Sequence, residues 1–65
     1  MTIRLNGKDH ETAAPTIATL LEELALPRQT TLVEQNGEAR PRDEWQSATL
    51  QDGDKLEILR VAAGG

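Results

Sequence analysis

Side chains that commonly carry chemistry are few in this sequence, and they stand apart from one another. His10 is the only histidine and Ser47 the only serine, and neither has a partner at a spacing that indicates a nucleophile and its base. Asp52 and Asp54 flank Gly53, but a calcium loop needs more oxygen ligands over a longer stretch, and Asp-Gly-Asp is typical of a tight turn. The absence of cysteine excludes a disulfide framework, a thiolate metal site and a cysteine nucleophile. We therefore predict no enzyme active site and no metal site, with His10 a solvated turn residue and Ser47 structural.

The end of the sequence, Ala62-Ala63-Gly64-Gly65, is the remaining place where chemistry is expected. Glycine loses more conformational freedom on folding than any other residue, so two of them at the last two positions need a reason. A carboxylate on Gly65 that is converted to an acyl-adenylate becomes an electrophile for a sulfur or nitrogen nucleophile. A narrow channel in a partner enzyme would admit a Gly-Gly backbone and exclude branched side chains. We therefore predict that Ala62, Ala63 and Gly64 thread into such a channel and that Gly65 is modified; a frayed terminus is the alternative.

Length and composition bound the kind of protein. Sixty-five residues make one small domain. The core must be aliphatic because Trp45 is the only aromatic residue, and a lone tryptophan in such a domain is expected to close one end of the core rather than to serve as an exposed anchor. The net charge of -4, without a Lys/Arg cluster, argues against nucleic acid as a partner. The start, MTIRLNGK, has no long apolar run, so we expect no membrane span and take the cytoplasm as the default location.

The first half of the chain predicts a β-hairpin followed by a helix. Residues 2–5 alternate polar and apolar side chains, and Asn6-Gly7 then favours a tight turn into an edge strand over 8–11. Thr16 is a suitable N-cap, and apolar side chains follow it at the spacing of one helix face: Ile17, Leu20, Leu21 and Leu24. Pro27 disfavours helical geometry at the preceding residue, so the helix should end near Ala25.

The second half predicts three more extended segments. Residues 30–35 form a strand with Thr31 and Val33 on one face and Leu32 and Glu34 on the other. A turn at 36–37 leads to a short extended piece that ends at Pro41. We expect Asp43 to cap a single helical turn over 44–46. A turn at 52–54 precedes the last strand, 55–61.

Together these elements predict an α+β domain over residues 1–61, followed by a flexible Gly-Gly tail over 62–65. One helix lies across one face of a mixed sheet of four to five strands. The first and last strands form the centre of the sheet, and they run parallel because the helix connects the two halves. The predicted core comprises Ile3, Leu5, Ile17, Leu20, Leu21, Leu24, Val33, Leu56 and Ile58.

The whole chain resembles the ubiquitin-like sulfur carriers of the β-grasp fold, most closely the ThiS-like carriers of thiamine biosynthesis. The resemblance rests on the total length and on four short motifs: Asn36-Gly37-Glu38, Pro41-Arg42 followed by Trp45, Asp52-Gly53-Asp54 and the terminal Gly64-Gly65. One departure is the middle strand, which in the family is a near-continuous apolar run. Here Gln35 falls on the same side as Val33, so that either the strand frays or Gln35 lies at the margin of the core.

The resemblance implies a mechanism and a set of partners. A ubiquitin-activating-type adenylyltransferase uses ATP to adenylate Gly65, so that the carrier itself binds no cofactor. A persulfide on a sulfur donor protein then replaces the adenylate to give a thiocarboxylate, and thiazole synthase takes that sulfur. A carrier for molybdopterin or another sulfur-containing metabolite, a protein modifier that forms isopeptide bonds, and a plain interaction module remain as alternatives.

The last strand also predicts where partners dock. Alternate residues of a strand face opposite sides of a sheet, so Leu56 and Ile58 facing the helix leave Leu59 and Val61 on the open face, just before the tail. Members of the resembled family dock through the sheet face next to the tail. We therefore expect Leu59 and Val61 to bind partners, with Arg60 a weaker candidate toward the margin of the sheet.

Overall fold

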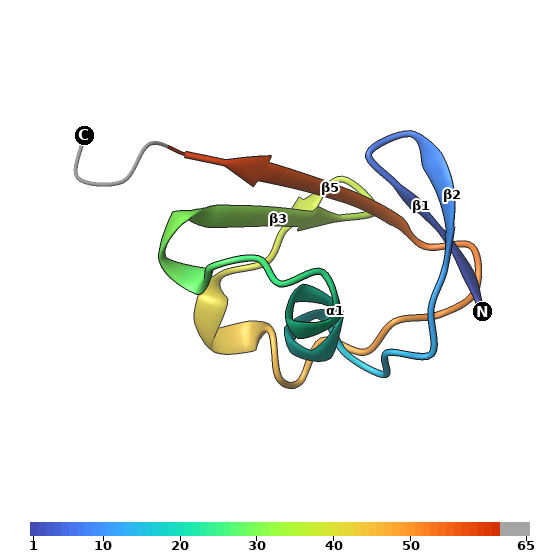
Figure 1. The fold of residues 1–65 in the computed structure, drawn as a ribbon, viewed down its shortest axis with the longest axis horizontal. Coiled ribbons are helices and arrows are strands. Elements are labelled where there is room, and N and C mark those ends of the chain that lie inside the picture. The colour runs from blue at the N-terminus through green and yellow to red at the C-terminus, as the bar shows by residue number, and fades with distance from the viewer. Residues whose placement is uncertain (62–65) are drawn as a thin grey trace.

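The computed structural model of the protein describes residues 1–61 and shows a five-stranded sheet with one α-helix packed against it (Figure 1). In chain order the elements are β1 (Thr2–Leu5), β2 (Lys8–Glu11), α1 (Ile17–Glu23), η1 (Arg28–Thr30), β3 (Thr31–Gln35), β4 (Glu38–Ala39), η2 (Arg42–Glu44) and β5 (Lys55–Arg60). Within the described residues no helix is long and apolar enough to cross a membrane.

The strand order β2-β1-β5-β3-β4 confirms the predicted arrangement, with β5 at the centre. β1 and β5 run parallel, whereas β5 and β3 are antiparallel over five registered pairs, from Thr31 opposite Arg60 to Gln35 opposite Leu56. The two hairpins turn at Asn6-Gly7 and Asn36-Gly37, where all four residues have positive φ. This is the geometry for which Asn-Gly is favoured. Along Figure 1, β5 therefore runs the length of the molecule and ends away from the N-terminus.

Helix α1 begins as predicted and ends slightly earlier. Thr16 is the N-cap, and its side chain and that of Thr19 accept hydrogen bonds reciprocally from backbone N–H groups. Regular helix stops at Glu23 instead of near Ala25, because Ala25 adopts a left-handed conformation with φ 57°. Its N–H and that of Leu26 donate to the carbonyls of Glu22 and Leu21, which closes the helix in the manner of a Schellman motif.

Three local predictions differ from the structure. Asp43 does not cap a helical turn: it lies inside the 3₁₀-helix η2, whose N-cap is Pro41 and has no side-chain hydrogen bond. Thr30 belongs to η1 and not to β3. The last strand ends at Arg60, although the N–H of Val61 still donates to the carbonyl of Thr30 at 2.8 Å. All three differences concern the first or last residues of short elements, where boundaries are least well defined by local sequence.

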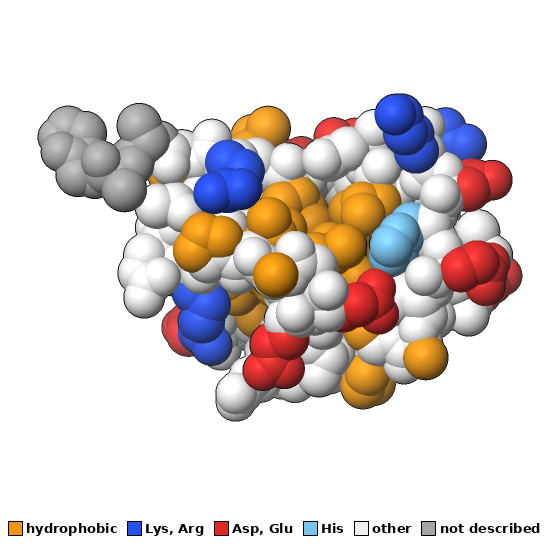
Figure 2. Space-filling view, viewed as in Figure 1, with side chains coloured by type: hydrophobic (Ala, Val, Ile, Leu, Met, Phe, Trp, Pro, Cys, Tyr) orange, Lys and Arg blue, Asp and Glu red, His pale blue; other side chains and the backbone are white. Residues whose placement is uncertain are grey.

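The core lies between α1 and one face of the sheet, and Figure 2 shows apolar side chains gathered in this layer. Seven of the nine predicted core residues are buried, while Leu5 and Leu24 are half-buried and pack against the cluster. Trp45 closes the core as predicted, at 1% exposure, and its indole N–H donates to the carbonyl of Arg40. Ala14 and Leu50, which carry no periodic signal, complete the core from the loops.

Replacing Leu21 with Ala should strongly destabilise the domain, because Leu21 is 2% exposed in the centre of the core. Buried Leu→Ala changes cost about 2–5 kcal/mol, a large part of the stability of so small a domain. Urea denaturation measures the loss, with Glu22→Ala on the exposed side of the same helix as the matched control. An unchanged midpoint for Leu21→Ala would contradict the helix face assigned here.

Candidate functional site

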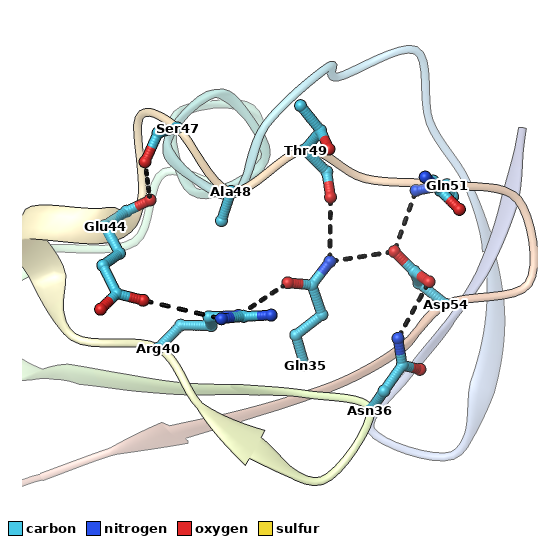
Figure 3. A pocket seen from close by; sticks show the side chains of 9 residues that line it. All are labelled: Gln35, Asn36, Arg40, Glu44, Ser47, Ala48, Thr49, Gln51 and Asp54. Atoms are coloured by element: carbon cyan, nitrogen blue, oxygen red, sulfur yellow. Dashed lines mark hydrogen bonds and ion pairs between the residues drawn. The ribbon is translucent and has the colours of Figure 1, made fainter.

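A polar hollow of about 480 Å³ lies at the end of the molecule where β3 turns into β4 (Figure 3). Gln35 lies at its base and is buried, at 6% exposure. The amide of Gln35 donates to the carbonyl of Thr49 and to Asp54, each at 3.0 Å, and accepts from Arg40 at 2.9 Å. Arg40 is further paired with Glu44 at 3.6 Å. The polar groups of this hollow thus bind one another, and the strand does not fray at Gln35.

Asp54 anchors this network to the turn that precedes β5. Burial raises the pKa of Asp54, but hydrogen bonds from Asn36, from the backbone N–H of Gln51 and from Gln35 outweigh it and lower the pKa below its ordinary value of 3.8. The side chain of Asn36 also accepts from the N–H of Lys55 at 2.9 Å. These bonds fix the start of β5 relative to the β3–β4 hairpin. The polar side chains of the hollow therefore have a structural role.

His10 is not the solvated turn residue that the sequence predicts. It lies on β2, is partly buried, and its Nε2 is 3.0 Å from a carboxylate oxygen of Glu23 at the end of α1. Hydrogen bonds from His10 and from Thr12 lower the pKa of the Glu23 carboxyl. The arrangement ties the edge strand to the helix. In residues 1–61, no three His, Asp or Glu side chains are grouped as metal ligands.

An apolar patch lies on the open face of the sheet, where β5 ends. Leu32, Leu59 and Val61 are 47%, 59% and 42% exposed, and Met1 is the other large apolar side chain exposed in the described chain. Leu32 and Leu59 are directly opposite each other on β3 and β5, and Val61 continues on the same face because side chains alternate along a strand. We call these three residues the tail-side patch. Sequence reasoning named Leu59 and Val61 and missed Leu32, which the alternation of β3 already placed on the open face.

The backbone that presents the tail-side patch is held on both sides. Beyond Leu56, β1 has turned away at Asn6, yet the Asn6 side chain takes the place of a neighbouring strand: its amide accepts from the N–H of Ile58 at 2.7 Å and donates to the Ile58 carbonyl at 3.1 Å. On the other side, the Arg42 guanidinium donates to the carbonyls of Arg28 and Gln29 in η1, directly before β3. β3 and Thr30 in turn hold the end of β5, through the pair of Thr31 with Arg60 and the bond from the Val61 N–H to the carbonyl of Thr30.

The remaining predicted site residues are placed as follows. Arg60 is exposed and registered opposite the buried Thr31, so it projects on the helix side of the sheet and lies outside the tail-side patch. The residues predicted to thread into a partner and to be modified, namely Ala62, Ala63, Gly64 and Gly65, lie outside the described residues.

The mixed five-stranded sheet and the single helix packed against it define a ubiquitin-like β-grasp protein of the α+β class. The model of the ThiS family matches residues 3–65. The chain belongs to the ThiS family.

Individual relatives agree with this assignment. The chain is 33% identical over 66 aligned residues to the sulfur carrier protein ThiS of Escherichia coli, with all of both chains covered. It is 35% identical to a thiazole synthase of Paramagnetospirillum magneticum, of whose length it spans only 20%. The crystal structure of the thiamine biosynthesis protein ThiS from Geobacter metallireducens has a TM-score of 0.84 at 30% identity and full coverage of both chains. The solution structure from the same organism has a TM-score of 0.81 at 30% identity, with 88% of that chain covered.

The Asp54 network predicts a pH dependence of stability. The pKa of the Asp54 carboxyl is lower in the folded protein than the ordinary value of 3.8, so the ionised carboxylate stabilises the fold above pH 3.8. This stabilisation is lost as the pH falls from 3.8 through the folded-state pKa. Asp54→Asn should therefore lower the free energy of unfolding at neutral pH and flatten its decline in acid. Urea titrations at a series of pH values measure both effects.

Asp43→Asn is the matched control for the Asp54 experiment, because in the described chain the Asp43 side chain is exposed and makes no hydrogen bond or ion pair. If Asp54→Asn and Asp43→Asn give the same acid profile, the network does not contribute to stability in the way described.

Proposed function

We propose that this chain carries sulfur for thiamine biosynthesis as a thiocarboxylate on Gly65. The observation that carries the proposal is the tail-side patch: a firmly held strand end presents Leu32, Leu59 and Val61 beside the start of the Gly-Gly tail. A protein that draws Gly64-Gly65 into its active site needs a surface to hold immediately upstream. The ThiS family membership and the name of the Escherichia coli relative, a sulfur carrier protein, support the same function.

The chemistry takes place on the carboxyl group of Gly65 inside other proteins. A carboxylate oxygen attacks the α-phosphorus of ATP in an adenylyltransferase of the ubiquitin-activating type, and pyrophosphate leaves. The terminal sulfur of a persulfide on a donor protein attacks the acyl carbon, and AMP leaves. A thiol then cleaves the S–S bond of the product, which leaves the thiocarboxylate on Gly65 and a disulfide on the donor side. The carrier needs no thiol of its own, in keeping with a sequence without cysteine.

Thiazole synthase is the proposed acceptor of this sulfur. The support is the relative from Paramagnetospirillum magneticum, which is named a thiazole synthase and contains a segment similar to the whole of this chain. A β-grasp segment within that protein is consistent with a carrier that works next to the synthase. The tail-side patch then serves the adenylyltransferase and the synthase in turn, since both need access to the same tail.

The central test is sulfur loading of chains with different ends. The unaltered protein, incubated with ATP, the adenylyltransferase and a persulfide donor, should gain the mass difference between sulfur and oxygen. A protein with residues appended after Gly65, or lacking Gly65, should fold normally and gain nothing, because no carboxylate is then placed for adenylation. Intact-protein mass spectrometry measures this, and the same extension placed before Met1 is the control.

Other products of that reaction point to other functions. Normal loading of the C-terminally extended protein would contradict the proposal. Adducts to lysine side chains would indicate a protein modifier, and a chain that stays unchanged under all conditions would indicate an interaction module. Loading without transfer to thiazole synthase would indicate a carrier for another metabolite.

Leu59→Asp should weaken binding to the adenylyltransferase without unfolding the domain. Leu59 is 59% exposed, so the charge meets water in the free protein and an apolar surface in the complex. A loss of about 2 kcal/mol or more is expected, the scale of an interface hot spot, which is about 30-fold in affinity. Calorimetry measures the binding and circular dichroism the melting, with Ala13→Asp, an exposed site in the loop before α1, as the matched control. Unfolding of Leu59→Asp, or normal binding, would contradict the assignment of faces.

A further inference from the structure

Two glutamates face each other on the open side of the sheet, directly beside the tail-side patch. Glu34 on β3 and Glu57 on β5 form a registered pair, two residues along the strands from the Leu32–Leu59 pair. Like charges directly opposite in an antiparallel pair are destabilising. In residues 1–61, neither carboxylate has a side-chain hydrogen bond or an ion pair (the ion pairs of this part of the chain are made by other groups). Lys55 lies two residues before Glu57 on the same face of β5, but within residues 1–61 it forms no ion pair with either glutamate. The fold therefore places two unpaired carboxylates opposite each other in an otherwise well-paired sheet.

The surroundings of the glutamate pair leave it open to a partner. Glu34 has only the small Ala39 opposite it on β4. β1 pairs with β5 no further than Leu56, so no strand flanks Glu57 on that side. The nearest cation on β1, Arg4, already binds Asp9 at 3.3 Å and a backbone carbonyl. The two carboxylates thus share their surroundings with one basic side chain of the described chain, Lys55 on β5 itself, and are paired with none.

The surface beside the pair is hollowed. Glu34, Glu57 and Lys55 line a depression of about 380 Å³ together with the turn at Asn36 and Gly37. This depression continues the open face away from the tail-side patch, because Leu32 and Leu59 are the next outward-facing residues along the same two strands. The depression therefore adjoins the tail-side patch on the same face of the sheet.

We propose that Glu34 and Glu57 form the charged half of the docking face and receive an arginine side chain of the activating adenylyltransferase. A guanidinium is planar and always charged, and its five N–H donors suit two carboxylates at once, whereas a lysine ammonium is a compact point charge. The inference rests on the proposed function, because it assigns the chemistry of the partner to the same face. The net charge of -4 also favours a partner with a basic surface.

The charge pattern also argues against a second copy of the chain as the occupant. Two copies joined through their open faces with these pairs in register would bring four carboxylates together beside the apolar patch. Opposed like charges of this kind suppress the wrong partner. The pair therefore admits a basic surface onto the tail-side patch and repels an identical one.

The test compares Glu34→Gln, Glu57→Gln and the double variant with the unaltered protein, using the adenylyltransferase as the probe. The double variant should bind about tenfold or more weakly, the scale of losing charge-assisted hydrogen bonds, and its affinity should depend less steeply on salt. Its urea midpoint should stay the same or rise, because the repulsion is removed. Glu22→Gln on the exposed side of α1 is the matched control and should change neither quantity. Titration calorimetry at low and high salt measures the binding.

Two results would overturn the inference. A double variant that is more stable but binds with unchanged affinity and salt dependence would show that the pair faces only solvent. A double variant that self-associates in sedimentation while its binding to the adenylyltransferase stays normal would show that the pair acts only against a second copy. Leu59→Asp distinguishes a failure of this inference from a failure of the proposed docking face. If Leu59→Asp weakens binding and the Gln variants do not, only the role given to Glu34 and Glu57 is wrong. If none of the variants weakens binding, the docking face itself is wrong.

Discussion

The pleat of the central strand β5 is the constraint on which the rest of the structure depends. Because β5 pairs with β1 on one side and β3 on the other, its register is fixed, and a slip of one residue would exchange its two faces. Leu56 and Ile58 fill the core beneath α1, and the residues between and after them face outward. The same strand thus provides the centre of the core and the surface that leads to the tail.

Polar side chains hold β5 where regular pairing runs out. Asp54 binds the start of the strand to the β3–β4 hairpin, and the Asn6 side chain replaces the missing neighbour at Ile58. No buried polar side-chain atom in residues 1–61 lacks a partner. Under the function proposed above, the end of β5 is then already ordered before a partner binds, and the cost of ordering it is met in folding and not on binding.

The sequence predicted the fold well because its signals are periodic. The spacing of Ile17, Leu20 and Leu21, the alternation in β3 and β5 and the two Asn-Gly turns all depend on near neighbours, and the structure confirms them. Contacts between segments far apart in the sequence were not predictable. The Gln35 amide forms hydrogen bonds with three other segments, and His10 contacts Glu23 only because α1 packs beside β2. Leu32 was recognised as outward-facing, but its place opposite Leu59 required the pairing of β3 with β5, which no local pattern encodes.

Methyl NMR spectra of the free carrier and of its complex with the adenylyltransferase test the central claim most directly, namely that the open face at the end of β5 is the docking platform. The account predicts large shifts or broadening for the methyl groups of Leu32, Leu59 and Val61, with the methyl groups of the loop and helix on the other side, such as Ala13 and Ala18, little changed. Perturbation concentrated on α1 and its flanking loops, with the methyl groups of the tail-side patch unchanged, would contradict it.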